Sequence, residues 1–382
     1  MEEKRIEKDE YGNEQIRVNT ETVKCRGCGA NMRFDPDKNV LICDHCGNVQ
    51  DLNDQNVAEE LSLIDGMNND KKWSEDRAMM FRCDNCGAKI VLNKDETATT
   101  CPFCGTNHVQ KVEDLSGLKP NAVLPFAFGK EKASEFSKKW AKKRIFAPRR
   151  FKKSLKSENL NGIYSPCFTF DSVTTSVYAG RIGETRTRTV GSGKNRRTKT
   201  YIVWRNISGT FYENFDDILI TAGKKCNQKT VDKLSPYPTN DSKEFNEKYL
   251  LGFMAYQYDE ELTDCWGDAK RKMDVILRKK ILDQYTHDTV AYLNVSTTHE
   301  NVTYKYVMLP VYVGNFNFRK KIYNFFVNGT SGKVTGKTPV SFWRVLIAVI
   351  LGLAVVGGIG YWLYSLGVFD EILEQGVNLL DF

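Results

Sequence analysis

The sequence lacks most features that mark secreted, multi-spanning or catalytic proteins. Its 382 residues open with a charged, polar stretch rather than the basic and then apolar run of a secretory signal. The mean hydropathy of −0.46 excludes a protein with many membrane spans. We find no phosphate-binding loop, no paired catalytic carboxylates, and no Ser or Cys partner for His287 or His299. We therefore expect a protein that is not an enzyme, with its cysteines kept reduced in the cytosol.

Cysteine, in contrast, is abundant and regularly spaced. Eight of the 11 cysteines form four Cys-x-x-Cys pairs, with 14 residues between the pairs of each set and an offset of 58 between the sets. Two such pairs supply the four thiolates of a closed, tetrahedral zinc site. The spacing predicts two structural Zn²⁺ sites, with ligands Cys25, Cys28, Cys43 and Cys46 in a first zinc ribbon (22–50), and Cys83, Cys86, Cys101 and Cys104 in a second (79–111).

Each second cysteine of a pair is followed by a glycine, at Gly29, Gly47, Gly87 and Gly105. We expect a positive φ at each glycine, with its backbone amide facing a sulfur atom. His45 and His108 lie in or just after a pair and are interpreted as bystanders. Cys167, Cys226 and Cys265 have no partner at ligand spacing, so we expect them to be buried thiols.

One long apolar run lies near the C-terminus. Residues 345–369 are 25 consecutive residues without a charge, about 37 Å of helix against a hydrocarbon layer of roughly 30 Å. They predict a single transmembrane helix. Basic residues precede it and an acidic tail (370–382) follows, which places the N-terminal bulk in the cytoplasm and the tail outside the cell membrane. Small residues, such as Ala348 and Gly352, allow oligomerisation through the span.

Charge divides the rest of the chain. Residues 1–110 carry 14 Lys and Arg against 21 Asp and Glu, whereas residues 111–344 carry 41 against 23. We predict a polar N-terminal segment (1–21), an acidic linker between the ribbons (51–78) with a short helix over 57–64, and a basic α+β domain (120–338). Within that domain the patterns predict helices over 131–146 and 259–285, a hairpin over 185–204, and several strands over 289–328. The fold class is α+β, β-rich, with two N-terminal zinc ribbons and the transmembrane helix.

Two cationic segments are candidate contact sites. They could be solvated faces, a surface for anionic lipid headgroups, or a nucleic-acid surface with interleaved aromatic residues. Their cations are Lys138, Lys139, Lys142, Lys143, Arg144, Arg149, Arg150, Arg186, Arg188, Arg196 and Arg197.

Several short stretches resemble a family of bacterial zinc-ribbon membrane proteins often labelled primosomal protein N′-like, helicase-like or phage-replication-like. The stretches are residues 124–126, 146–148, 162–166, 249–253, 304–312 and 327–337, the last containing Asn328-Gly329-Thr330. The label implies a replication helicase, but the chain has no helicase motor, so the likeness to that helicase lies in the ribbons. Family members are also similar to proteins that act beside membrane-stress proteins, which implies an anchored adaptor.

We therefore interpret the chain as a membrane-anchored zinc-ribbon adaptor or scaffold. It would recruit a protein partner to the cytoplasmic face of the membrane, in a membrane-stress response. The alternative is a membrane-associated nucleic-acid-binding protein linked to DNA replication.

Overall fold

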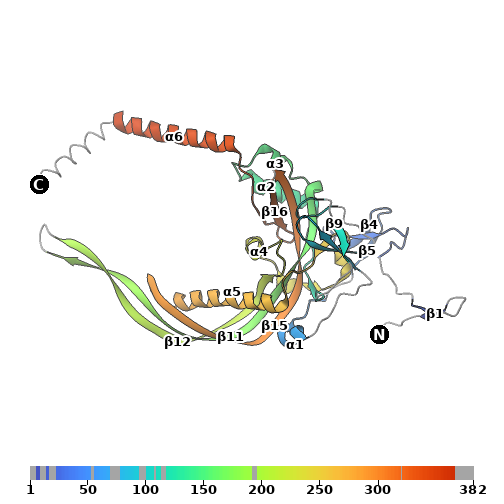
Figure 1. The fold of residues 1–382 in the computed structure, drawn as a ribbon, viewed down its shortest axis with the longest axis horizontal. Coiled ribbons are helices and arrows are strands. Elements are labelled where there is room, and N and C mark those ends of the chain that lie inside the picture. The colour runs from blue at the N-terminus through green and yellow to red at the C-terminus, as the bar shows by residue number, and fades with distance from the viewer. Residues whose placement is uncertain are drawn as a thin grey trace.

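The computed structural model describes residues 6–8, 14–16, 23–52, 56–68, 78–93, 100–106, 109–112, 118–191, 196–319 and 321–365. Most of the predicted N-terminal segment and all of the acidic tail lie outside these residues. A central α+β body carries the two cysteine-rich ribbons on one side (Figure 1). A long β-sheet arm and the C-terminal helix α6 project from the opposite side.

The body is built around one extended sheet. Its strand order is β13-β10-β15-β11-β14-β8-β7-β9, with β12 beside β11, β6 and β16 beside β15, and β17 beside β16. The bounds are β6 Leu61–Ser62, β7 Ala78–Cys83, β8 Lys89–Asn93, β9 Val109–Val112, β10 Ala122–Val123, β11 Leu160–Val190, β12 Arg197–Thr221, β13 Lys243–Glu244, β14 Met254–Tyr256, β15 Thr289–Phe318, β16 Lys321–Asn328 and β17 Val334–Gly336. Two small antiparallel sheets stand apart from it, one of β1 Ile6–Lys8 and β2 Glu14–Ile16, the other of β3 Met32–Asp35, β4 Val40–Cys43 and β5 Val49–Asp51.

Three strands of unusual length form the arm. Strands β11, β12 and β15 have 31, 25 and 30 residues, and beyond a bulge at Asp171 they continue out of the body as a three-stranded sheet. Before the bulge β11 is buried almost continuously, and after it buried and exposed residues alternate. This change is expected where a strand leaves a sheet covered on both faces and enters one covered on a single face.

Helix α5 (Leu262–Asp283) covers the inner face of the arm (Figure 1). Its apolar side, including Ile281, packs with Tyr178, Ile182 and Ile207 of the arm strands. The outer face of the arm is left open in the part of the chain that the structure describes.

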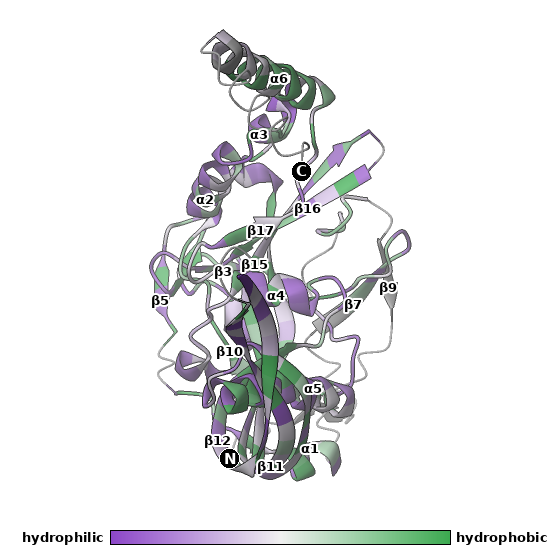
Figure 2. Ribbon diagram, turned by 90° about the vertical axis from the view of Figure 1, so that its left-hand side faces the viewer, coloured by the Kyte–Doolittle hydropathy of each residue, from purple (hydrophilic) through white to green (hydrophobic). Residues whose placement is uncertain are grey.

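In the described part of the chain, four more helices lie around the body. They are α1 Leu63–Asn68, α2 Lys130–Lys142, α3 Arg149–Lys153 and α4 Gln228–Leu234, with single 3₁₀ turns at Ser157–Asn159, Thr239–Asp241 and Glu247–Leu250. Figure 2 shows that α2 and α3 are largely hydrophilic and that both lie near the start of the apolar helix α6.

Five of the six stretches that carry the family resemblance contribute to one aromatic cluster in the core. Phe126 stacks on Phe253 with ring centroids 4.3 Å apart, and both rings contact Tyr164. Phe126 also packs on Tyr312, and a Cβ at Gly329 would lie only 2.6 Å from its ring. These five stretches therefore contain residues that specify the packing of the body.

Some predicted elements differ from the observed ones. The helix expected over 57–64 is wrong, because Leu61–Ser62 pair with β15 and the helix begins only at Leu63. The hairpin expected over 185–204 is only the tip of β11 and β12, and the strands expected from residue 289 to 319 are one strand, β15. The two long helices are observed at Lys130–Lys142 and Leu262–Asp283, close to their expected positions.

Helix α6 (Phe342–Ser365) is apolar on all sides. Its segment Phe342–Trp362 has a mean hydropathy of 2.3 and is 0 % buried against the rest of the chain, so it is long and apolar enough to cross a membrane. The hydrogen bonds that join this helix to the body are at its base. There Ser341 N donates to Phe146 O, and Arg344 Nη1 donates to Ile145 O.

Candidate metal centres

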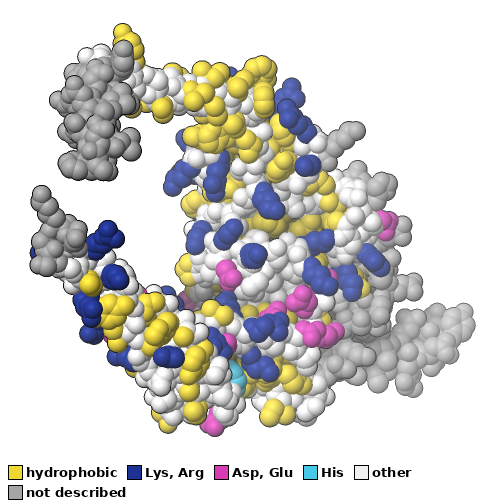
Figure 3. Space-filling view, turned by 60° about the vertical axis from the view of Figure 1, so that its left-hand side comes forward, with side chains coloured by type: hydrophobic (Ala, Val, Ile, Leu, Met, Phe, Trp, Pro, Cys, Tyr) yellow, Lys and Arg dark blue, Asp and Glu magenta, His cyan; other side chains and the backbone are white. Residues whose placement is uncertain are grey.

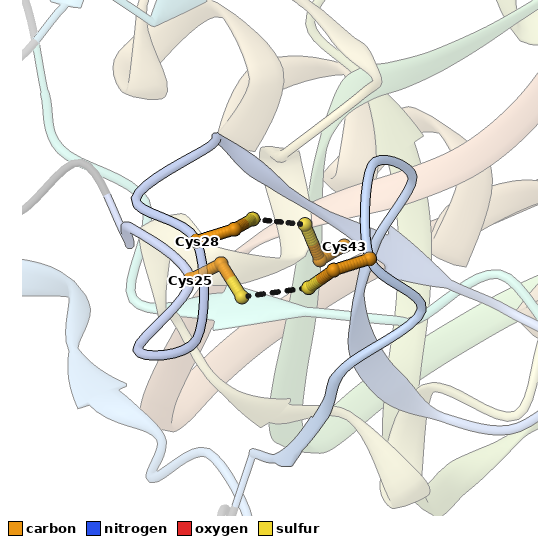
Figure 4. A group of neighbouring side chains, drawn as sticks. Cys25, Cys28 and Cys43 are labelled. Atoms are coloured by element: carbon orange, nitrogen blue, oxygen red, sulfur yellow. Dashed lines mark hydrogen bonds between the residues drawn. The ribbon is translucent and has the colours of Figure 1, made fainter.

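The first cysteine cluster brings four sulfur atoms to one point. The Sγ atoms of Cys25 and Cys46 lie 3.4 Å apart, and those of Cys28 and Cys43 lie 3.5 Å apart (Figure 4). All four are within 4.8 Å of one another. Sulfur atoms at 2.3 Å from a tetrahedral zinc ion would be about 3.8 Å apart, so these four residues fit a zinc ion with little adjustment.

The second cluster has the same arrangement. The Sγ distances are 3.6 Å between Cys83 and Cys104, and 3.7 Å between Cys86 and Cys101. Its four sulfur atoms also lie within 4.8 Å of one another. Both predicted ligand sets are therefore assembled, and each can bind a zinc ion. His45 is not in either group, and His108 lies outside the described residues.

The glycines adopt the expected backbone conformation but a different hydrogen bond. All four have φ between +71° and +74°. Gly29 N donates to Cys25 O at 2.8 Å, and the other three glycines repeat this bond to the first cysteine of their pair. The amides that face the sulfur atoms belong to the next residues, such as Ala30 for Cys28 and Asn48 for Cys46. The expectation that the glycine amide itself faces sulfur is wrong, because the knuckle turn uses that amide to close on the carbonyl.

Hydrogen bonds divide the thiols of each cluster into stronger and weaker acids. In the first cluster the Gly27 amide, 3.4 Å from the sulfur, lowers the pKa of Cys25 to about 6. The Asn48 amide lowers the pKa of Cys46, but the neighbouring thiols Cys25 and Cys28 outweigh it and raise the value to about 12. A metal ion would displace the protons that these thiols hold, so metal affinity must rise with pH.

The first ribbon, defined as residues 23–52, is attached to the body through its hairpin and not through its cysteines. Phe34 at the end of β3 is buried against Tyr249 and Phe253, and its amide donates to Leu251 O. On the next turn Asp37 accepts from Gly129 N and pairs with Lys132 at the start of α2. At the cysteine end Cys28 and Cys46 are exposed, whereas Cys25 and Cys43 are buried.

The second ribbon, defined as residues 78–112, is part of the body itself. Strand β8 pairs with β14, which joins the ribbon to the main sheet. Its cysteine end is packed as well. Phe103 contacts Tyr256, Asn315 Nδ2 donates to Pro102 O, and Lys225 Nζ donates to Cys86 O. Consequently Cys83 and Cys101 are buried, and Cys86 and Cys104 only partly exposed.

A third cluster was not expected from the sequence. The carboxylates of Glu60, Asp171 and Asp216 lie within 4.8 Å of one another at the root of the arm. Lys305 already occupies the neighbouring space, 3.3 Å from Glu60 and 3.1 Å from Asp217. These residues are up to 245 positions apart in the sequence, and no spacing motif relates them. We interpret the cluster as an ion-paired junction of linker, body and arm.

The remaining candidate residues fall into separate places. Cys167, Cys226 and Cys265 are buried free thiols, as expected. The eleven candidate cations are all exposed, but they form two groups at different ends of the molecule (Figure 1). One group, Lys138 to Arg150, lies on α2, α3 and the turn between them. The other, Arg186 to Arg197, lies at the tip of the arm.

The fold and these centres define a class, an α+β protein with two four-cysteine metal-binding clusters near its N-terminus and an exposed apolar helix near its C-terminus. The chain is 31 % identical to the uncharacterized protein YdjG of Bacillus subtilis (strain 168), over 334 residues that cover 84 % of this chain and 91 % of that protein. It therefore belongs to the same family as YdjG. No protein-family model matches the chain, and no solved structure does.

Proposed function

We propose that this protein is a membrane-anchored zinc-ribbon adaptor. Helix α6 would hold the body on the cytoplasmic face of the cell membrane, and the zinc-loaded ribbons would recruit a protein partner there. The observation that carries the proposal is α6, a 24-residue helix whose apolar segment Phe342–Trp362 the body leaves uncovered. Exposing so much apolar surface to water is costly, whereas a bilayer covers it.

The ribbons support the adaptor role. A zinc ion held by four thiolates has no open position for water or substrate, so its contribution is to fold the ribbon. The first ribbon then presents an exposed knuckle surface, including Cys28, His45 and Cys46. A protein partner can contact this surface while the hairpin end stays attached to the body.

The direction of α6 restricts where a bilayer can lie relative to the arm. The helix and the arm project from the same side of the body (Figure 1), and the arm carries exposed cations such as Arg181, Arg186 and Arg188. Charged side chains are excluded from hydrocarbon. A bilayer crossed by α6 must therefore lie clear of the arm, so the helix turns relative to the body about residues 338–341.

The tip of the arm favours a second candidate function, nucleic-acid binding beside the membrane. Tyr201 and Trp204 are partly exposed there, among arginines that include Arg188 and Arg197. Aromatic and cationic side chains in this arrangement suit single-stranded nucleic acid. Part of the charge is already neutralised, because Glu184 pairs with Arg186 and Arg205.

The test is affinity purification of the full chain, tagged at its N-terminus, from membranes in mild detergent. We expect the chain to resist alkaline extraction and to retain a protein partner after nuclease treatment. A chain truncated before Phe342 should carry the same partner into the soluble fraction. The double variant Cys28→Ser/Cys46→Ser should lose the partner but stay in the membrane, while Cys167→Ser, at a buried non-ligand cysteine, should keep it.

Two results would contradict the adaptor. Extraction of the intact chain by alkali would exclude the anchor. Co-purification of nucleic acid, with loss of every partner on nuclease treatment, would favour the second candidate.

A further inference from the structure

The base of α6 lies against the most cationic part of the body. We call residues 142–153 the corner, since they include the end of α2, the turn after it and α3. The two hydrogen bonds from Ser341 and Arg344 end on the carbonyls of Phe146 and Ile145 in this turn. The corner therefore lies directly beside the start of α6.

The surface of the corner combines apolar tips with cations. Ile145 is 66 % exposed, and beside it at the base of α6 Phe342 and Trp343 are 61 % and 70 % exposed. Around them lie Lys142, Lys143, Arg144, Arg149 and Arg150, all exposed. Figure 3 shows Lys and Arg side chains next to apolar side chains beneath the base of the helix. Aromatic and basic residues in this mixture are typical of the membrane–water interface.

These cations have no counter-charge of their own. Among the described residues, none of the seven candidate cations from Lys138 to Arg150 forms an ion pair. Arg144 lies over the ring of Trp140, 5.3 Å from its centroid, which holds it at the surface without neutralising it. At the arm tip Arg186 and Arg205 share Glu184. The corner differs from the arm tip in its place, because its unpaired cations lie where α6 begins.

We propose that the corner is a lipid-binding surface that rests on the anionic headgroups of the bilayer entered by α6, with Ile145 and Phe146 at the level of the headgroups. The inference rests on the proposed membrane anchor and names its lipid class. Each cation near a membrane surface adds attraction to anionic lipid within a Debye length. The corner would thereby fix the height of the body above the membrane and leave the arm and the first ribbon free.

The experiment uses the full chain in nanodiscs of phosphatidylcholine alone, or of phosphatidylcholine and phosphatidylglycerol in equal parts. Hydrogen–deuterium exchange is followed in peptides that cover the corner and the arm tip. In the anionic nanodiscs we expect corner amides to exchange about tenfold more slowly, with no change at the arm tip. High salt should remove the difference.

A matched pair of variants tests whether the cations of the corner cause the slower exchange in anionic nanodiscs. Arg149→Glu/Arg150→Glu should abolish the lipid-dependent protection, and Arg186→Glu/Arg188→Glu should preserve it. Both pairs of residues are exposed. A circular-dichroism spectrum unchanged from that of the parent chain checks that each variant folds. A second variant, Ile145→Ser, should reduce the protection without changing the charge.

The outcomes separate this inference from the proposed function. If the chain incorporates in nanodiscs but the corner exchanges equally in both lipids, the lipid-binding surface is wrong and the anchor stands. If the chain does not incorporate at all, the anchor is wrong. Protection of the corner by a DNA duplex, but not by phosphatidylglycerol, would overturn the inference in favour of a nucleic-acid surface.

Discussion

The two ribbons have the same cysteine spacing and nearly the same sulfur geometry, but they are attached to the body in opposite ways. The first docks through the tip of its hairpin, around Phe34, and two of its four cysteines, Cys28 and Cys46, are exposed. The second is continuous with the main sheet through β8, and its cysteine end is packed against the body. Two metal centres of equal chemistry are therefore expected to have unequal consequences. Metal at the second supports the body, whereas metal at the first shapes an exposed surface.

The strongest test of this difference removes one ligand from each cluster. Cys83→Ser should destabilise the whole body by several kcal/mol, because a structural zinc contributes on the order of 10 kcal/mol to a small ribbon and β7 transmits the loss to the sheet. Cys28→Ser, at an exposed ligand, should leave the body folded and reduce the zinc content to about one ion per chain. Urea unfolding in detergent and metal analysis measure both. Equal losses of stability would mean that the two ribbons are equivalent.

A second test separates docking from metal binding in the first ribbon. Phe34 is 1 % exposed, and Phe34→Ala should cost about 3 kcal/mol. The cost should be local, with faster amide exchange in the first ribbon and unchanged exchange in the second. Val49→Ala, in the same ribbon but at an exposed position, is the control. Exchange that accelerates throughout the body would show that the first ribbon is also an integral part of it.

A third test weakens the packing of the second centre without touching a ligand. Lys225 donates to Cys86 O, and Lys225→Met keeps the side-chain length but loses this bond, at a cost of about 1 kcal/mol. Zinc should leave the second cluster faster, as measured with a chromogenic chelator, while the first cluster is unaffected. Lys224→Met, at the exposed neighbour, should change neither rate. A uniform acceleration at both clusters would contradict the separate roles.

The contrast between the ribbons could not be predicted from the cysteines. Their spacing specifies a local turn and ligand geometry, so both clusters and the positive φ of the four glycines were predictable. Docking depends on partners far along the chain, such as Phe253 for Phe34 and Tyr256 for Phe103. The cysteine turns and the apolar helix α6 were both predictable because each depends on local sequence only. For α6 that local signal is its apolar composition.

The full length of the arm strands could not be predicted from local sequence. Polar and glycine residues in β11, such as Asp171 and Gly183, resemble strand ends, yet the ladder continues through both. At Asp171 the strand bulges instead of stopping, because its carboxylate accepts from the Asp217 amide across the ladder. A bulge held by a residue more than 40 positions away leaves no local pattern.

The smallest expected effect is on the pH dependence of stability. It arises where Asp171 of the arm root meets Glu60 of the linker between the ribbons. Burial and the adjacent Glu60 carboxyl raise the pKa of Asp171 to about 7, and the hydroxyl of Thr303 contacts both carboxyl groups. A raised folded-state pKa means that the stabilisation is complete below the unfolded value of Asp171 and is lost as pH rises towards 7. Lys305 and Asp217, which also face the cluster, form an ion pair with each other.

Asp171→Asn should therefore flatten the fall in unfolding free energy between about pH 4 and pH 7, measured by urea titration at several pH values. The change should be modest, since the carboxyl is only partly buried and solvent screens its interactions. Asp65→Asn, at an exposed carboxyl on the same linker, should leave the pH profile unchanged. If Asp171→Asn also leaves it unchanged, Glu60 and Asp171 share no proton, and Glu60 is held by Lys305 and the Thr303 hydroxyl without Asp171. The attachment of the linker to the body would then not depend on pH over this range.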